Sequence, residues 1–188
     1  PTQFLEEYVE EENTIVKKYK PGDFVVCNLS SVNLGKAVPD HVLERLIKIQ
    51  VRMLDNVIDI NTLPIKQAEM TNKKYRAVGL GTFGWHHLLA LQNIGWETEE
   101  AVQFADELYE KIAYLAIQAS MELSKEKGNY PFFSGSSWDT GAYFDVRGYT
   151  DEKWLELKQQ VQEHGIRNGY LMAVAPNSST SIIAGSTA

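Results

Sequence analysis

Residues 171–183 read LMAVAPNSSTSII: an apolar run, a proline, a series of hydroxyl residues and a second apolar pair. A continuous apolar run of this kind is typical of a strand buried on both faces, as in a parallel sheet. Pro176 ends the run, and Ile182 and Ile183 can lie at the start of a helix. The stretch therefore predicts a buried strand over 171–175, then a turn, then a helix.

The turn at 176–181 would lie beyond the carboxyl end of that strand, where ligands of α/β folds bind. Backbone N–H groups at a helix start, together with hydroxyl groups, suit an anion such as phosphate. On chemistry alone, two interpretations stay open: a phosphate-binding turn, or a Ser/Thr-rich N-cap with no ligand. The side chains concerned are Asn177, Ser178, Ser179, Thr180 and Ser181.

The longest periodic segment runs from Thr98 to Lys127. Its apolar residues recur at intervals of three and four and form one stripe, which predicts a long amphipathic helix. Thr98 is the expected N-cap, and Gly128 followed by Pro131 is the expected stop. The stripe consists of Ala101, Ala105, Leu108, Ile112, Leu115, Ala119 and Leu123.

Further helices are predicted from Asp40, as the capping residue, to about Ile60, and over 154–164. The glycine-punctuated apolar run at 75–81 predicts a buried strand or a tight strand exit. Residues 129–150 are rich in glycine, serine and aromatic residues, and predict an ordered surface excursion whose rings pack inward. Strands that alternate with helices predict an α/β architecture.

The amino-terminal residues 1–22 are charge-rich, with a run of glutamates followed by lysines, which is typical of solvated surface. Within and just after them, Ile15-Val16 and the apolar residues 24–26 flank the turn residues Pro21-Gly22-Asp23. Proline followed by glycine suits a tight turn, so these arms are predicted to form a hairpin.

Composition narrows the class of protein. A length of 188 residues suits one domain or a large piece of one, and a net charge of -7 argues against a nucleic-acid-binding surface. A single cysteine excludes an internal disulfide scaffold and predicts a reducing, cytoplasmic compartment. No uninterrupted apolar run reaches the ~18 residues of a membrane span, so no membrane association is expected.

Two motifs favour structural interpretations. Residues 79–84 match G-x-G-x-x-G, but a dinucleotide site also needs an acidic residue that ends a second strand. The acidic residues at 97–100 begin the long helix instead, so a tight packing turn is favoured. His86 and His87 would point about 100° apart on a helix and could not chelate one ion together, so no metal site is predicted.

Cys27 ends an apolar run and opens the segment CNLSSVNLG, residues 27–35. By composition alone, a lone buried cysteine is usually an inert small hydrophobe. However, this segment resembles the stretch around the second redox-active cysteine of class I ribonucleotide reductase large subunits. The resemblance continues in the same order along the chain, through RAVGLG at 76–81, the helix end at 122–128, HGIRN at 164–168, LMA at 171–173 and PNSSTS at 176–181.

The resemblance implies a ten-stranded α/β barrel, with 1–22 as a charged segment continuous with an upstream part and 23–188 as a segment of the catalytic barrel. It implies reduction of ribonucleoside diphosphates to their 2′-deoxy forms. In that chemistry a thiyl radical abstracts the 3′-hydrogen, the 2′-hydroxyl leaves as water and two cysteines become a disulfide. Cys27 would be one of that pair, and Asn177–Ser181 would hold the substrate diphosphate.

The family's radical cysteine lies upstream of a Pro-Thr pair, and this sequence opens with Pro1-Thr2. The resemblance therefore implies complementary large-subunit segments that carry the radical cysteine and the second redox cysteine. It further implies a small subunit that holds the metal radical cofactor, a reductant of the thioredoxin or glutaredoxin type, and ATP or dNTP effectors bound elsewhere; the chain itself would hold no cofactor. The alternative from another class is a non-catalytic nucleotide-phosphate-binding or regulatory module. A dehydrogenase that uses the glycine motif is a third.

Overall fold

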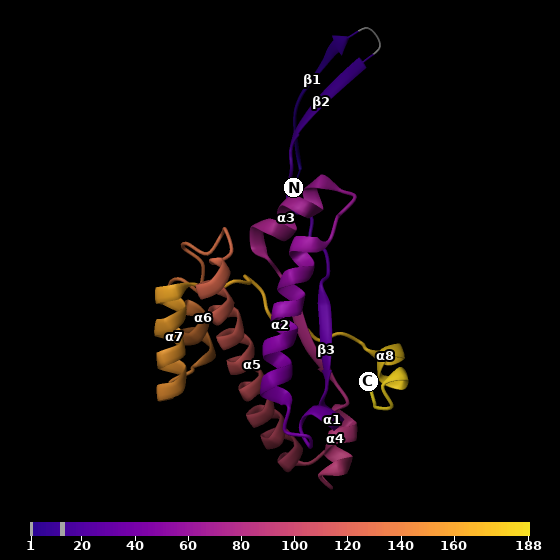
Figure 1. Ribbon diagram of the computed structural model, residues 1–188, viewed down its shortest axis with the longest axis vertical. Helices are drawn as coiled ribbons and strands as arrows, with labels where there is room; N and C mark the ends of the chain where they lie inside the picture. Colours follow the sequence, from indigo (N-terminus) through magenta and orange to yellow (C-terminus); the bar gives the residue numbers. More distant parts are fainter. Residues whose placement is uncertain (1, 12–13) are drawn as a thin grey trace.

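The computed structural model describes residues 2–11 and 14–188 (Figure 1). The strands are β1 (Gln3–Glu11), β2 (Thr14–Lys20), β3 (Leu29–Asn33) and β4 (Gly79–Phe83). The helices are α1 (Leu34–Ala37), α2 (Leu43–Ile60), α3 (Lys66–Tyr75), α4 (Trp85–Leu91), α5 (Glu99–Lys127), α6 (Ala142–Arg147), α7 (Glu152–His164) and α8 (Ser178–Ile183). The predicted mixed α/β architecture is confirmed.

A parallel sheet lies at the centre of the body. β3 and β4 pair from Leu29–Gly79 to Asn33–Phe83. Met172 adds a parallel bridge to Leu80 on the other side of β4. Among the described residues the sheet stays open, because these segments do not close into a barrel.

The prediction of a strand buried on both faces over 171–175 is wrong. Leu171 is buried, but Met172 is 42% exposed and Val174 is 98% exposed. The segment lies at the edge of the open sheet, where Met172 forms a parallel bridge with Leu80. Backbone hydrogen bonds from Leu80 N–H to the carbonyl of Leu171 (2.7 Å) and from Ala173 N–H to the carbonyl of Leu80 (3.1 Å) hold it there. Within the described residues, one face of this segment is therefore exposed to solvent.

The long helix follows its prediction closely. The side chain of Thr98 accepts a hydrogen bond from the backbone N–H of Ala101 at 3.2 Å, and Gly128 ends α5. Together with α2, it packs on one face of the sheet, where Val32 and Leu80 belong to the buried core.

The helix predicted from Asp40 begins later, at Leu43, and Asp40 does not cap it. Instead, the backbone N–H of Asp40 donates to the carbonyl of Lys36 at 3.0 Å, in the turn that follows α1. A short helix that the sequence pattern did not reveal therefore occupies the approach to α2. The end of α2 at Ile60 agrees with the prediction.

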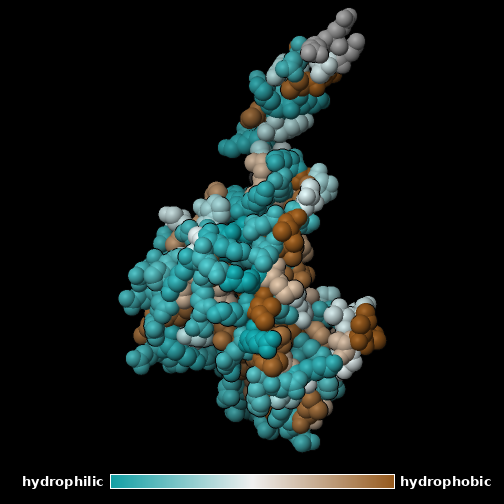
Figure 2. Space-filling view, viewed as in Figure 1, coloured by the Kyte–Doolittle hydropathy of each residue, from teal (hydrophilic) through white to brown (hydrophobic). Residues whose placement is uncertain are grey.

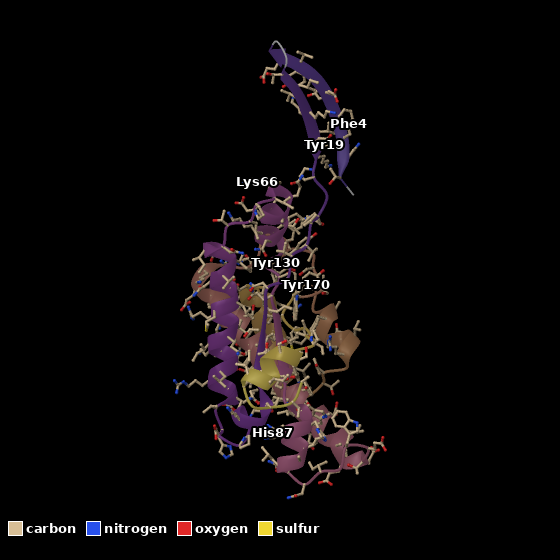
Figure 3. All side chains as sticks on the ribbon, turned by 90° about the vertical axis from the view of Figure 1, so that its right-hand side faces the viewer. Phe4, Tyr19, Lys66, His87, Tyr130 and Tyr170 are labelled. Carbon is tan, nitrogen blue, oxygen red and sulfur yellow. The ribbon has the colours of Figure 1, made fainter. Side chains whose placement is uncertain are left out.

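The predicted hairpin is also wrong in its pairing. Ile15 pairs with Val9 and Val16 pairs with Tyr8, so the arms are β1 and β2. Their connection at 12–13 lies outside the described residues. The hairpin projects from the body (Figure 1), and the rings of Phe4 and Tyr19 meet edge to face near its base, with centroids 5.6 Å apart (Figure 3).

The excursion at 129–150 is ordered, and most of its rings pack inward as predicted. Trp138 and Phe144 are buried, and the indole N–H of Trp138 donates to the carbonyl of Gly169 at 3.0 Å. Phe132 is the exception, because it is 55% exposed.

A buried ionic network joins the helix layer to the sheet. Asp55 of α2 is fully buried. Its carboxylate accepts hydrogen bonds from Arg76 Nε at 2.8 Å, Asn168 Nδ2 at 3.1 Å and Arg167 Nε at 3.2 Å. The guanidinium of Arg76 also binds Asp59, one helical turn later, at 2.8 Å. The sequence pattern had not indicated this network.

The Arg76–Asp59 pair predicts a pH dependence of stability. The hydrogen bond from Arg76 lowers the pKa of Asp59 below its ordinary value, although burial opposes the shift. A lowered carboxyl pKa stabilises the fold above the pKa of the unfolded state, near 4, and that contribution is lost as the pH falls through the folded-state pKa. Because Asp59 is 45% exposed, the contribution is at most about 1 kcal/mol.

Asp59→Asn should therefore lower the thermal midpoint at pH 7, and its difference from the wild type should shrink as the pH falls through the lowered pKa of Asp59, where the wild-type carboxylate becomes protonated as well. Differential scanning fluorimetry across this range measures the difference. An equal destabilisation at both ends of the range would show that the pair contributes no charge-dependent stability.

Candidate functional site

Cys27 lies on the open face of the sheet. From Val25 to Ser30 the side chains alternate between exposed and partly buried, as a strand with one covered face requires. Cys27 belongs to the exposed set, and Asn28 belongs to the set that faces the helices. The thiol is therefore accessible, and the interpretation of Cys27 as an inert buried residue is not supported.

The thiol residue borders a cavity of about 410 Å³. The wall is formed by the residues just before β3, the residues just before β4 and the segment around Met172. The cavity therefore lies at the amino ends of the three parallel segments. Both apolar and hydrogen-bonding groups line it, which suits a small organic ligand. Besides Cys27 and Asn28, it is lined by residues that include Leu29, Val78, Tyr170 and Met172.

Glycines leave the middle of this face free of side chains. A Cβ atom on Gly81 would lie 2.6 Å from the carbonyl oxygen of Ala173 and 3.1 Å from Oγ of Ser31. A Cβ atom on Gly79 would overlap the side chain of Leu29. The neighbouring backbones thus approach closely here, which supports the packing interpretation of the glycine motif.

The predicted turn at 176–181 leads into a helix, α8, as expected. Asn177 has a left-handed backbone (φ 52°), and its Nδ2 donates to the carbonyls of Ala175 at 3.0 Å and Thr82 at 3.3 Å. Ser181 is buried, and its hydroxyl donates to the carbonyl of Ser178 at 2.9 Å. These two side chains hold the turn together.

The remaining hydroxyl side chains of the turn face solvent. Ser178, Ser179 and Thr180 are exposed at the start of α8. Their backbone N–H groups belong to the first turn of the helix, which has no preceding carbonyl to accept them within the helix. They can therefore contact an anion.

Cys27 and the turn lie toward opposite ends of the sheet. The side chain of Asn177 donates a hydrogen bond to the carbonyl of Thr82, and Thr82 pairs with Val32 in the sheet. From Cys27 to the level of Val32 the extended chain advances by about 16–17 Å.

A family model of the ribonucleotide reductase barrel domain matches residues 6–188. The chain belongs to this family. It is 52% identical over 182 residues to the ribonucleoside-diphosphate reductase subunit alpha of Treponema pallidum, covering 96% of this chain and 22% of that protein. It is 40% identical over 184 residues to the subunit alpha of Helicobacter pylori, covering 91% of this chain and 23% of the relative.

A eukaryotic relative is similar as well. The large subunit of Caenorhabditis elegans ribonucleoside-diphosphate reductase is 34% identical over 181 residues, which cover 91% of this chain and 23% of that protein. The barrel-domain chain thus spans about a fifth of the length of the curated relatives it matches.

Sequence reasoning missed two polar residues of β3 and its approach in this barrel-domain chain. Asn28 donates from Nδ2 to the carbonyl of Leu54 at 2.8 Å. Asn33 carries amide atoms that are shielded from solvent and have no hydrogen-bond partner within the described residues. The two-residue alternation through CNLSSVNLG would have placed Asn28 on the helix-facing side and Asn33 on the side of Cys27.

His87 has a structural role near the turn. Its Nδ1 lies 3.0 Å from Oγ of Ser186, just after α8, and Figure 3 shows His87 close to that helix. Within 2–11 and 14–188, no group of His, Cys, Asp and Glu side chains is arranged to hold a metal ion. Across the described part of the chain, every helix is too short or too polar to span a bilayer.

Proposed function

We propose that this chain is a component of the large subunit of a ribonucleoside-diphosphate reductase, which converts ribonucleoside diphosphates to 2′-deoxyribonucleoside diphosphates. Cys27 supplies one redox thiol, and Asn177, Ser178, Ser179, Thr180 and Ser181 hold the substrate diphosphate. The observation that carries the proposal is an accessible cysteine beside a cavity on the open sheet face of a ribonucleotide reductase barrel domain.

The redox step balances with two thiols. The S–H groups of Cys27 and a second cysteine supply two electrons and two protons, and an S–S bond forms between the sulfurs. The C2′–O bond of the ribose breaks, its oxygen leaves as water and C2′ gains a hydrogen. A thiyl radical on a third cysteine starts the reaction by taking the 3′-hydrogen and returns it at the end.

The second and third cysteines lie on complementary segments of the large subunit, since this chain has one cysteine. Those segments also supply the strands that complete a ten-stranded barrel around the open sheet. Exposed apolar residues fit such cover: Val174 is 98% exposed and Ile183 of α8 is 88% exposed. Figure 2 shows apolar residues along the side of the body where α8 lies. Unpaired edges and apolar patches of this kind require partners.

The remaining partners act from outside the chain. A small subunit generates the radical with its metal cofactor, a thioredoxin- or glutaredoxin-type dithiol restores the cysteine pair, and ATP or dNTP effectors bind elsewhere in the large subunit. The residues of this chain bind the diphosphate, present one thiol and shape the cavity beside that thiol.

The test is reconstitution. A large subunit that contains this chain, mixed with its small subunit and a dithiol reductant, should convert a ribonucleoside diphosphate to the deoxy form, as measured by chromatography of the products. Nucleotide binding without product formation in the complete assembly would overturn the proposal and favour a non-catalytic phosphate-binding module.

The phosphate role of the turn has its own test. Ser179→Asp places a negative charge beside the proposed diphosphate and should raise the KM for substrate at least about tenfold, equivalent to ~1.4 kcal/mol, because like charges repel. Ser134→Asp adds the same charge at an exposed position in the excursion at 129–150, outside the turn at 176–181. This control variant should leave KM unchanged. Equal KM values for both variants would remove the turn from the diphosphate site.

A further inference from the structure

Asn28 joins the strand that carries Cys27 to the helix layer. Its Nδ2 donates to the carbonyl of Leu54 in α2 at 2.8 Å. Its backbone carbonyl accepts from the N–H of Gly79 at 2.9 Å. The residue next to the thiol is therefore held from two directions, by a helix and by the neighbouring strand.

The sheet ladder alone would not fix Cys27. The paired register of β3 and β4 begins at Leu29 and Gly79, two residues after the cysteine. Cys27 is exposed and lies on the face opposite to Asn28 and α2, because successive side chains of an extended chain alternate between faces. The bond from Asn28 to Leu54 therefore adds a side-chain anchor to the backbone bond with Gly79, next to the thiol.

The helix residue that receives this bond is itself fixed. Leu54 precedes Asp55, whose buried carboxylate binds Arg76 at 2.8 Å and Asn168 at 3.1 Å. Arg76 lies three residues before β4, and Asn168 lies just before the Tyr170–Ala173 segment. One turn of α2 thus holds the amino ends of all three parallel segments that border the cavity.

We propose that Asn28 is a positioning residue for the redox thiol: its side-chain amide, bound to the carbonyl of Leu54, orients Cys27 toward its disulfide partner. This inference rests on the proposed redox function of Cys27. Disulfide formation is sensitive to geometry, because the two Cα atoms must approach to about 4.4–6.8 Å with the sulfurs aligned. A displacement of about 1 Å in a reacting group can cost roughly 100-fold in rate.

The test uses the complete large subunit with its small subunit. Asn28→Ala should lower kcat about tenfold or more while KM for the ribonucleoside diphosphate stays within about twofold, because the diphosphate turn is untouched. In the absence of reductant, the yield of the Cys27 disulfide per enzyme, measured by mass spectrometry, should fall in parallel.

Two further variants separate the hydrogen bond from packing. Asn28→Asp has nearly the same shape but cannot donate to a carbonyl while ionised, so it should lose at least as much activity as Asn28→Ala. Asn28→Gln keeps the donor and should recover a large part of kcat. Asn61→Ala, at an exposed position after α2, is the matched control and should behave like the wild type.

The outcomes are distinct. A lower thermal midpoint for Asn28→Ala with unchanged kcat and disulfide yield per folded enzyme would show a purely structural role and overturn the inference. If Cys27→Ser is inactive in multiple turnover and Asn28→Ala is fully active, the positioning role alone fails. If Cys27→Ser is itself fully active, the proposed redox function fails.

Discussion

Cys27→Ser should abolish multiple turnover in the reconstituted reductase, with a loss of at least roughly 100-fold. A serine hydroxyl cannot form a disulfide, so the two electrons for loss of the 2′-hydroxyl have no source. Nucleotide binding should stay largely intact, because serine is similar in size to cysteine and the proposed diphosphate turn lies toward the other end of the sheet. Product formation with a thioredoxin system measures the first effect, and calorimetry measures the second.

Cys27→Ala provides the matched variant for this experiment. It removes the thiol without adding a hydroxyl, so it should be as inactive as the serine variant. Undiminished turnover in both would remove Cys27 from the redox role. A loss confined to Cys27→Ser would point to an effect of the hydroxyl rather than to the missing thiol.

Asp55→Ala should lower the free energy of unfolding far more than the loss of Asp59 does. It leaves Arg76, Arg167 and Asn168 without their common acceptor, and breaking a buried ion pair by removing one partner costs about 3–5 kcal/mol. That is a large share of the stability of a typical domain. The amides of α2 should exchange with deuterium roughly 150- to 5000-fold faster in the assembled subunit, as followed by mass spectrometry.

Asp59→Ala is the control for Asp55→Ala. Asp59 binds the same guanidinium from the next turn of α2, but its side chain is 45% exposed and solvent can replace the lost partner. Its removal should cost no more than about 1 kcal/mol. Equal effects of the two variants would mean that burial of Asp55 does not determine the strength of the network.

Local patterns predicted the elements that depend on local physics. The stripe of α5 and its cap at Thr98 agree with the structure, because a helix is set by residues three and four apart and by its own ends. The turn before α8 followed from proline and hydroxyl residues in sequence. Both features are complete within a few residues of chain.

The N-terminal pairing needed information that turn residues do not carry. Pro21-Gly22 favoured a turn, but Glu7 and Lys17 form a salt bridge of 2.9 Å across β1 and β2. Cross-strand pairs of opposite charge support this register, and each contributes a fraction of a kcal/mol. The charged residues that were predicted to form solvated surface thus also pair with one another across the hairpin.

The anchoring of the site could not be read from local patterns. Asp55 meets Arg76 and Asn168 only in three dimensions, since 21 and 113 residues of chain separate the partners. In sequence, Asp55 reads as an ordinary polar position of a helix. The exposure of Val174 likewise depends on what packs beside the sheet rather than on the apolar run that contains it.

The pairing of Leu29 with Gly79, and of Leu80 with Met172, joins segments that leave the ribosome at different times during synthesis. At about 5–20 residues per second, roughly fifty residues separate the emergence of β3 from that of β4, a delay of about 3–10 s. The segment at Met172 follows β4 after roughly ninety more residues, a further delay of about 5–18 s. During this interval β3 has no pairing partner and is exposed. Efficient folding of the newly made chain should therefore depend on chaperones that bind extended apolar segments.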